Sequence, residues 1–115
     1  MDFGNKKTEN MDNQFISGLI NKYISRLVAN KINVEEVYLF GSFAKSTNQE
    51  YSDIDLAIIV DKFNNRFNFE IQLMSLRNDD ETIIEPHVFL KDEFNETDPF
   101  VHEIIKTGRK IYFKN

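Results

Sequence analysis

The sequence predicts a small α/β domain of the α+β kind: one mixed β-sheet with helices packed on one side. Three observations support this fold class. Apolar residues recur at helical spacing in two segments, β-prone runs flank a polar central loop, and 115 residues that are 41% hydrophobic provide one core but not two domains. We expect residues 1–11, which are polar and of mixed charge, to be a flexible N-terminal segment, and residues 12–115 to be the single domain.

The N-terminal helix has the clearest signal. Apolar residues recur at alternating spacings of one and three from Phe15 to Val28, which makes one broad stripe on a 3.6-residue helix. Asp12 or Asn13 would cap the start of this helix. We therefore expect the stripe to face the core.

Four β-prone runs predict the strands. Residues 37–40 end at a Gly-Ser pair, and residues 54–60 follow a polar loop. Residues 82–90 form a third run, in which Pro86 indicates an edge strand or a bulge. Residues 110–113 predict a short last strand.

Two shorter helices are predicted between the later strands. The first covers about residues 65–77, where three apolar residues recur at helical spacing: Phe67, Ile71 and Met74. The second follows Asp98, a candidate N-cap, with Pro99 at the first helical position and Gly108 at the end.

Composition excludes several classes of function. The chain has no cysteine, so disulfide, thiolate-zinc and cysteine-nucleophile chemistry are ruled out. The net charge of −5 is the wrong sign for a surface that clamps nucleic acid, and we expect no direct nucleic-acid binding. The polar start is not a signal peptide, and no apolar run approaches a bilayer span, so we expect a cytoplasmic protein with no membrane partner.

Two carboxylates at the start of one β-run are the first candidate site residues. Asp53 and Asp55 are two residues apart, so on a strand they project to the same face. Asp55 lies inside an apolar run, where an unpaired carboxylate is costly. A cation between two such carboxylates offsets their repulsion, and hard oxygen ligands select Mg²⁺ or Mn²⁺.

A phosphate-binding turn is expected where the first strand ends. Gly41 lets the backbone approach a ligand closely, and the hydroxyl of Ser42 adds a hydrogen-bond donor. A single helical turn starting at Ser42 would direct backbone N–H groups toward an anion. Lys45, on the next turn, would place a positive charge near the same phosphates, although a solvated lysine is an equal alternative.

A third acid, Glu85, lies in the run 82–90, which can pair beside the strand of the two aspartates. Three carboxylates can hold two metal ions, an arrangement that stabilises in-line displacement at phosphorus. His87 shares the face of Glu85 on a regular strand, but we expect no ligand role for it because no second histidine is nearby.

These residues together resemble the signature of the nucleotidyltransferases of the DNA polymerase β superfamily, in particular the minimal nucleotidyltransferase (MNT) proteins. Gly41 and Ser42, then ten residues, then Asp53 and Asp55 match the pattern G-S-x₁₀-D-x-D. Glu85 stands in the place of the third family carboxylate, where Asp is common. The match covers roughly residues 34–90.

The resemblance implies a metal-dependent transferase with a nucleotidyltransferase-like fold. It would move a nucleoside monophosphate, with AMP expected, from a nucleoside triphosphate to a hydroxyl, with Mg²⁺ or Mn²⁺ as cofactor. Asp53, Asp55 and Glu85 would hold the metals and carry the catalysis, while Gly41, Ser42 and Lys45 would bind the nucleotide.

The resemblance also implies a partner. Small members of the family often accompany a helical HEPN protein with RNase activity and act as its antitoxin, so the expected acceptor is a tyrosine hydroxyl on such a partner. Two alternatives stay open: a non-catalytic antitoxin that masks its partner by contact, and a subunit of an antibiotic nucleotidyltransferase. A homo-oligomer is also left open.

Overall fold

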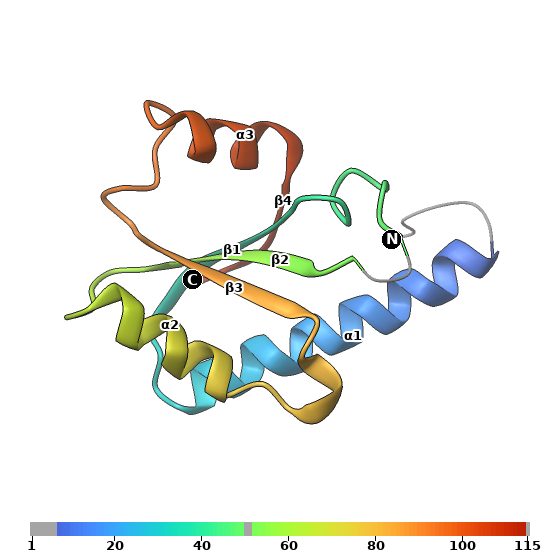
Figure 1. The fold of residues 1–115 in the computed structure, drawn as a ribbon, viewed down its shortest axis with the longest axis horizontal. Coiled ribbons are helices and arrows are strands. Elements are labelled where there is room, and N and C mark those ends of the chain that lie inside the picture. The colour runs from blue at the N-terminus through green and yellow to red at the C-terminus, as the bar shows by residue number, and fades with distance from the viewer. Residues whose placement is uncertain (1–6, 50–51, 115) are drawn as a thin grey trace.

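The computed structural model describes residues 7–49 and 52–114, with side chains from residue 14 onward. Figure 1 shows three helices around a four-stranded sheet. The elements follow in the order α1 (Lys7–Ala29), β1 (Val34–Phe40), β2 (Ile54–Val60), α2 (Arg66–Ser75), the 3-10 turn η1 (Asp79–Glu81), β3 (Ile84–Leu90), α3 (Pro99–Thr107) and β4 (Arg109–Phe113). This is the predicted order of helices and strands.

The sheet is mixed, as predicted, with the strand order β3-β2-β1-β4. β1 pairs antiparallel with both β2 and β4, whereas β2 and β3 run parallel. The parallel pair needs a crossover, and α2 with η1 supplies it. The N-terminal ends of β2 and β3 therefore lie side by side, next to the C-terminal end of β1.

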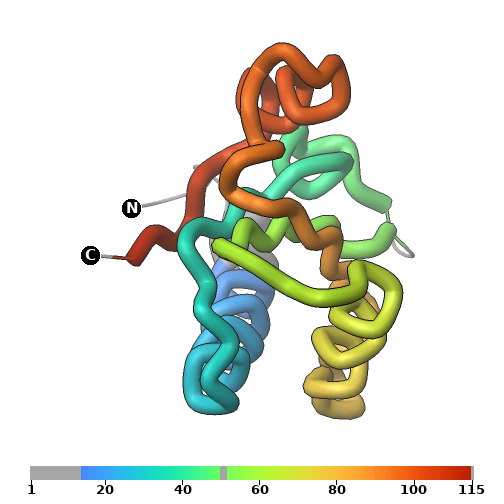
Figure 2. Tube along the Cα trace, turned by 90° about the vertical axis from the view of Figure 1, so that its left-hand side faces the viewer, coloured from blue at the N-terminus to red at the C-terminus, as the bar shows by residue number. Residues whose placement is uncertain are grey.

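The helices cover both faces of the sheet, which corrects the expectation that they pack on one side. α1 and α2 cover one face, and Figure 2 shows them together below the sheet while α3 lies above it. Alternate strand residues explain this division: Leu56 and Ile58 face α1 and α2, whereas Ala57 and Ile59 are buried on the opposite face. Ile104 of α3 covers that second apolar patch.

The first helix begins earlier than its apolar stripe. α1 starts at Lys7, so Asp12 and Asn13 lie inside the helix instead of capping it. Of the N-terminal segment predicted to be flexible, residues 1–6 lie outside the described residues and residues 7–11 belong to α1. A hydrophobic stripe marks only the packed part of a helix, so it gives no sign of a polar extension.

The second helix packs through a different stripe from the predicted one. Phe67 and Ile71 are 71% and 44% exposed, whereas Leu73 is fully buried and Phe69 packs against the same core. Phe67 and Ile71 are four residues apart, as are Phe69 and Leu73, and both pairs satisfy helical spacing. Spacing alone does not choose between these pairs, and packing against the sheet core buries Leu73 and partly buries Phe69.

β3 is an edge strand, as Pro86 indicated. Its outer edge is covered by side chains of α2: Glu70 accepts a hydrogen bond from the N–H of Val88, and Arg66 donates one to the carbonyl of Val88. Pro86 has no N–H to cover. These contacts leave little of the β3 edge able to pair with another strand.

The predicted caps of α3 are confirmed. Asp98 is its N-cap and accepts hydrogen bonds from two backbone N–H groups, Pro99 is its first residue, and Gly108 follows its end.

Within the described residues, none of the helices combines the length and apolar character that crossing a bilayer requires.

Candidate active site

The site is built around a close contact between Gly41 and Asp55. Gly41 follows the last residue of β1 and has a φ of +76°, a conformation that favours glycine. A Cβ added to Gly41 would overlap Oδ2 of Asp55 and lie 3.3 Å from its Cγ. Glycine is therefore required here both by its backbone conformation and by the carboxylate beside it.

The chain after Gly41 forms a compact turn. The N–H of Lys45 donates to the carbonyl of Gly41 over 3.2 Å, and the N–H of Thr47 donates to the carbonyl of Ser42 over 2.9 Å. Among the described residues, the N–H groups of Ser42, Phe43 and Ala44 have no hydrogen-bond acceptor. This turn corresponds to the single helical turn expected at Ser42, and its N–H groups are available to an anion.

Ser46 closes this turn with a φ of 59°. This left-handed backbone conformation favours glycine over residues with a side chain. The chain keeps that conformation without glycine, because the hydrogen bond from the N–H of Ser46 to the carbonyl of Phe43, 3.4 Å long, helps to hold the turn.

Lys45 lies on the exposed side of the turn. Its Nζ is 3.7 Å from Oε2 of Glu103 on α3, and both side chains are about half exposed. The predicted positive charge therefore lies on the turn that follows Gly41, but in this structure it is paired with Glu103 of α3.

The three predicted acids lie on the ends of β2 and β3. Asp55 and Glu85 are paired positions of the parallel strands, and both are partly buried. Asp53 is exposed and precedes the first residue of β2, so it lies just outside the strand that was expected to contain it. The fold thus brings Gly41, Asp55 and Glu85 to one end of the sheet, with Asp53 at its margin.

His87 is a site residue that the sequence argument did not select. Its Nε2 is 3.2 Å from Oδ1 of Asp55, with side chains 38% and 29% exposed. The aromatic ring of Phe40 packs edge-on against the imidazole, with centroids 5.2 Å apart. The signal was present, because His87 shares the face of Glu85, but the strand pairing that brings it to Asp55 is visible only in the fold.

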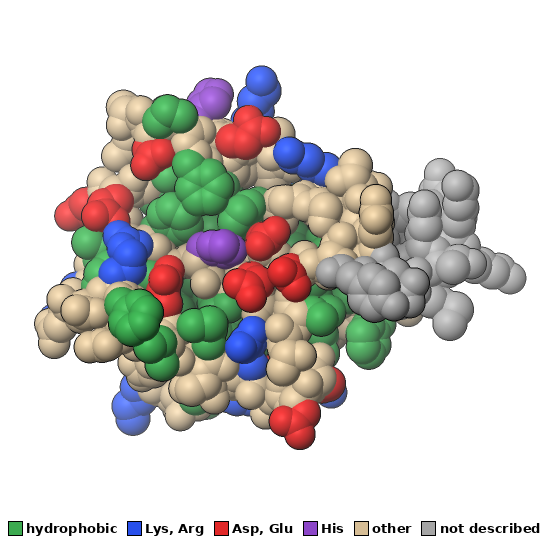
Figure 3. Space-filling model, in the orientation of Figure 1, with side chains coloured by type: hydrophobic (Ala, Val, Ile, Leu, Met, Phe, Trp, Pro, Cys, Tyr) green, Lys and Arg blue, Asp and Glu red, His purple; other side chains and the backbone are tan. Residues whose placement is uncertain are grey.

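A divalent cation fits this donor set by its chemistry. Asp53, Asp55 and Glu85 offer hard carboxylate oxygens, which suit Mg²⁺ or Mn²⁺. Figure 3 shows acidic side chains gathered beside a histidine on this face, with hydrophobic side chains next to them. Within the described part of the chain, however, no three His, Asp or Glu side chains are grouped as a ready-made metal site.

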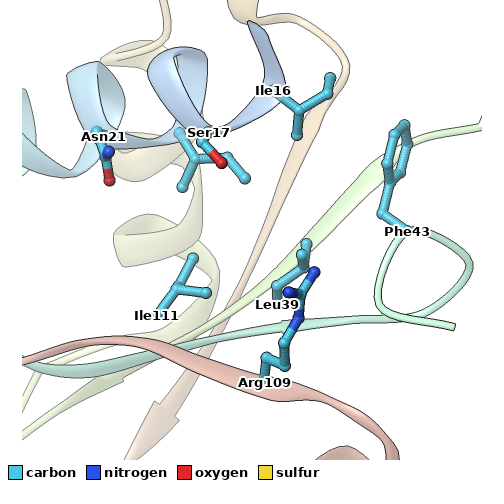
Figure 4. Close-up of a pocket in the computed structure, with 8 residues that line it drawn as sticks. Ile16, Ser17, Asn21, Leu39, Phe43, Arg109 and Ile111 are labelled. Atoms are coloured by element: carbon cyan, nitrogen blue, oxygen red, sulfur yellow. The ribbon is translucent and has the colours of Figure 1, made fainter. Parts of the chain in front are cut away.

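A separate cavity of about 230 Å³ lies on the other face of the sheet. Figure 4 shows its lining, which comes from α1, β1, β4 and the turn after β1. Leu39 faces this cavity, whereas its neighbour Phe40 faces Asp55. Apolar side chains such as Ile16 and Ile111 make up most of the lining, and Ser17, Asn21 and Arg109 are its polar members.

Comparison with solved structures supports the fold. A protein from Sulfolobus solfataricus, described as a candidate nucleotidyltransferase, is 20% identical with a TM-score of 0.71 over 97% of this chain and 93% of that one. A toxin–antitoxin structure with AMP-PNP contains a chain that is 22% identical, with a TM-score of 0.56 over 83% of this chain and 73% of that one.

A third structure contains a tri-AMPylated Shewanella oneidensis HEPN toxin in complex with an MNT antitoxin. It matches with 20% identity and a TM-score of 0.52, over 84% of this chain and 71% of that one. At these identities the likeness concerns the fold alone.

Comparison at the level of sequence places the chain in a family. A search of the curated proteins finds no match. The family model described as "Polymerase beta, Nucleotidyltransferase" matches residues 22–115, which include both the phosphate turn and the acids of β2 and β3. The chain therefore belongs to the polymerase beta nucleotidyltransferase family.

Proposed function

We propose that this protein transfers a nucleoside monophosphate, AMP in the expected case, from a nucleoside triphosphate to a tyrosine hydroxyl of a HEPN-type toxin partner. The observation that carries the proposal is the contact of Gly41 with Asp55, which holds a phosphate-binding turn against a carboxylate. A turn with available N–H groups and an acid at its base are the two parts that nucleotidyl transfer requires.

The phosphate turn would bind the triphosphate. The N–H groups of Ser42 and Phe43 would donate to phosphate oxygens, and the hydroxyl of Ser42 would add another donor. Lys45 would contribute positive charge after leaving its exposed ion pair with Glu103. Such pairs contribute at most about 1 kcal/mol, so a phosphate can displace the carboxylate.

The acids would hold Mg²⁺ or Mn²⁺, with Asp53 and Asp55 at the nucleotide and Glu85 at the acceptor. When bound there, a divalent cation would neutralise charge on the triphosphate and polarise the attacked phosphorus. Glu85 would accept the proton of the acceptor hydroxyl. The hydroxyl oxygen then forms a bond to the α-phosphorus, the bond from that phosphorus to the bridging oxygen breaks, and pyrophosphate leaves.

We propose a tyrosine on a partner protein as the acceptor. Structures of the same fold contain AMP-PNP or a tri-AMPylated HEPN toxin, and these matches support the proposal. The acidic net charge of −5 also suits association with a basic RNA-binding partner.

Intact-mass measurement tests the proposal. The full chain is co-expressed with a HEPN-type partner encoded beside it and incubated with ATP and Mg²⁺, and the partner should gain the mass of one or more AMP groups. Asp55→Asn should abolish the gain and restore toxicity. Asp61→Asn, at an exposed position after the other end of β2, is the matched control and should keep both activities.

The same experiment separates the alternatives. If Asp55→Asn neutralises the toxin as fully as the parent, and neither version changes the mass of the partner, masking by contact replaces transfer. A gain of mass on an added antibiotic, with none on the partner, would instead indicate antibiotic nucleotidylation.

A further inference from the structure

The structure brings the imidazole of His87 to the carboxylate of Asp55. The distance between Nε2 and Oδ1 is 3.2 Å, which is within hydrogen-bonding range. No role in the reaction proposed above uses this residue. Its position next to the central acid of the site nevertheless requires an explanation.

Strand pairing holds the two residues at this distance. In the parallel register of β2 and β3, Asp55 pairs with Glu85 and Ala57 pairs with His87. His87 therefore lies two residues after Glu85 on the same face of β3, and its side chain reaches diagonally back to Asp55. Because the two residues are on neighbouring, directly paired strands, their separation does not depend on a loop.

The ring of His87 is also held from the side. Phe40 packs edge-on against it, with an interplanar angle of 61°. Phe40 is itself buried, pairs with Asp55 across β1 and β2, and contacts Phe100 of α3. These contacts limit the rotation of the imidazole and keep Nε2 directed at the carboxylate.

The two oxygens of the Asp55 carboxylate have different neighbours. Oδ2 lies against the backbone of Gly41, and Oδ1 faces Nε2 of His87. A hydrogen bond from Nε2–H would fix the plane of the carboxylate and would offset the repulsion from Glu85 on the neighbouring strand. One lone pair on each oxygen would stay directed outward.

We propose that His87 is a positioning residue: it donates a hydrogen bond to Oδ1 of Asp55 and orients this carboxylate for a divalent cation. The inference rests on the proposed function, because it takes Asp55 as a metal ligand. Hydrogen bonds from outside the ligand set orient metal-binding side chains, and their loss typically lowers metal affinity about 10–100-fold.

Mn²⁺ binding to the full chain tests this role without any measurement of transfer. The parent is compared with His87→Phe, His87→Gln and Asp55→Asn at one pH, by calorimetry and by the electron paramagnetic resonance of Mn²⁺. His87→Phe keeps a ring for Phe40 to pack on but removes the donor, and we expect about 10–100-fold weaker binding. His87→Gln keeps an N–H donor at similar reach and should bind within about threefold of the parent, since the hydrogen bond is retained.

The Mn²⁺ affinities of these variants decide whether His87 positions Asp55. Parent-like affinity in His87→Phe, or equal loss in His87→Phe and His87→Gln, would overturn the positioning role. Nitrogen coupling from an imidazole in the pulsed Mn²⁺ spectrum of the parent would also overturn it, because His87 would then be a direct ligand. Thermal melting of each variant shows whether it is folded, and His87→Leu replaces His87→Phe if the latter is not.

Asp55→Asn separates this inference from the function on which it rests. If Asp55→Asn binds Mn²⁺ as tightly as the parent, the metal assignment itself fails. If Asp55→Asn weakens binding and His87→Phe does not, only the role of His87 fails.

Discussion

Gly41 and Asp55 lie so close together that the carboxylate occupies the space a side chain at position 41 would need. The two residues are far apart in sequence and meet because Phe40, directly before Gly41, pairs with Asp55 across the antiparallel strands β1 and β2. The spacing between the Gly-Ser pair and the acids therefore reflects a β-hairpin, in which the end of β1 and the start of β2 lie side by side.

The Gly41→Ala variant should disturb this contact. Alanine is strained at a φ of +76°, at a cost of about 1–2 kcal/mol, and its Cβ would displace Asp55. We expect lower thermal stability and a larger proportional loss of Mg²⁺-ATP binding, measured by calorimetry. Gly18→Ala in α1, where a Cβ meets no atom within 4 Å, is the control and should stabilise the fold by about 0.5–1 kcal/mol. Equal nucleotide affinity in both variants would contradict the site.

Glu85→Gln should separate nucleotide binding from turnover. The amide keeps the shape of the side chain but cannot accept the proton of the acceptor hydroxyl, so transfer should fall about 100-fold or more. Binding of Mg²⁺-ATP should change little, because we propose that Asp53 and Asp55, and not Glu85, hold the nucleotide-bound cation. In contrast, Asp55→Asn should lose binding without loss of fold. Unchanged transfer in Glu85→Gln would remove this residue from the site.

Glu103→Gln should strengthen nucleotide binding. In the free protein Glu103 pairs with Lys45 over 3.7 Å, and this exposed pair must open before Lys45 can reach a phosphate. Removing its cost of at most about 1 kcal/mol should tighten the Kd for Mg²⁺-ATP by up to about fivefold. Glu96→Gln, which removes an exposed acid paired with His102, controls for the change in net charge. The idea fails if both variants tighten binding equally.

Stability should fall at high pH because of Tyr23. This side chain is buried and its hydroxyl donates to the carbonyl of Leu73 over 2.5 Å, and desolvation raises the pKa of the phenol well above its ordinary value. A raised folded-state pKa means that the contribution is complete below the unfolded value of about 10 and is lost as the pH rises above it. Urea unfolding between pH 8 and about pH 11 measures the decline.

Tyr23→Phe is the comparison for this pH dependence. It should be less stable at neutral pH by about 1 kcal/mol, because the hydrogen bond to Leu73 is lost. Its free energy of unfolding should then decline less steeply above pH 10. Parallel pH curves for the two proteins would show that another group causes the decline.

The ion pair between Arg26 and Glu81 should contribute more to the free energy of unfolding than a surface ion pair does. Glu81 is only 1% exposed and lies 2.5 Å from the guanidinium of Arg26, which joins α1 to η1. Arg26→Met leaves the buried carboxylate without its charged partner, at a cost of about 3 kcal/mol. Lys91→Met removes an exposed lysine that lies 3.9 Å from Glu35, and it should change the free energy of unfolding by less than about 1 kcal/mol in the same urea titration.

Local patterns predicted most elements correctly because they act over a few residues. The strand 54–60, the cap of α3 at Asp98 and the edge position indicated by Pro86 are all confirmed. Each depends on a local property: β-propensity, a side chain that accepts from nearby N–H groups, or a missing donor. The start of α1 was predicted wrongly because an apolar stripe marks only the packed part of a helix. The buried stripe of α2 was predicted wrongly because it depends on what the helix packs against.

The sequence by itself determined the chemistry available to this protein. Its family signature, Gly41-Ser42 with Asp53 and Asp55, is readable without coordinates, because the residue types and their spacing limit what a turn and a strand can do. The roles of the acids as metal ligands stay predictions.

Only the tertiary structure decided which groups meet. The parallel pairing of β2 with β3 places Glu85 opposite Asp55 and brings His87 within 3.2 Å of it, while α3 crosses to the second face and engages Lys45 through Glu103. Such contacts depend on strand order and register, which the whole core selects by burying its apolar faces, and no local run of residues contains that information.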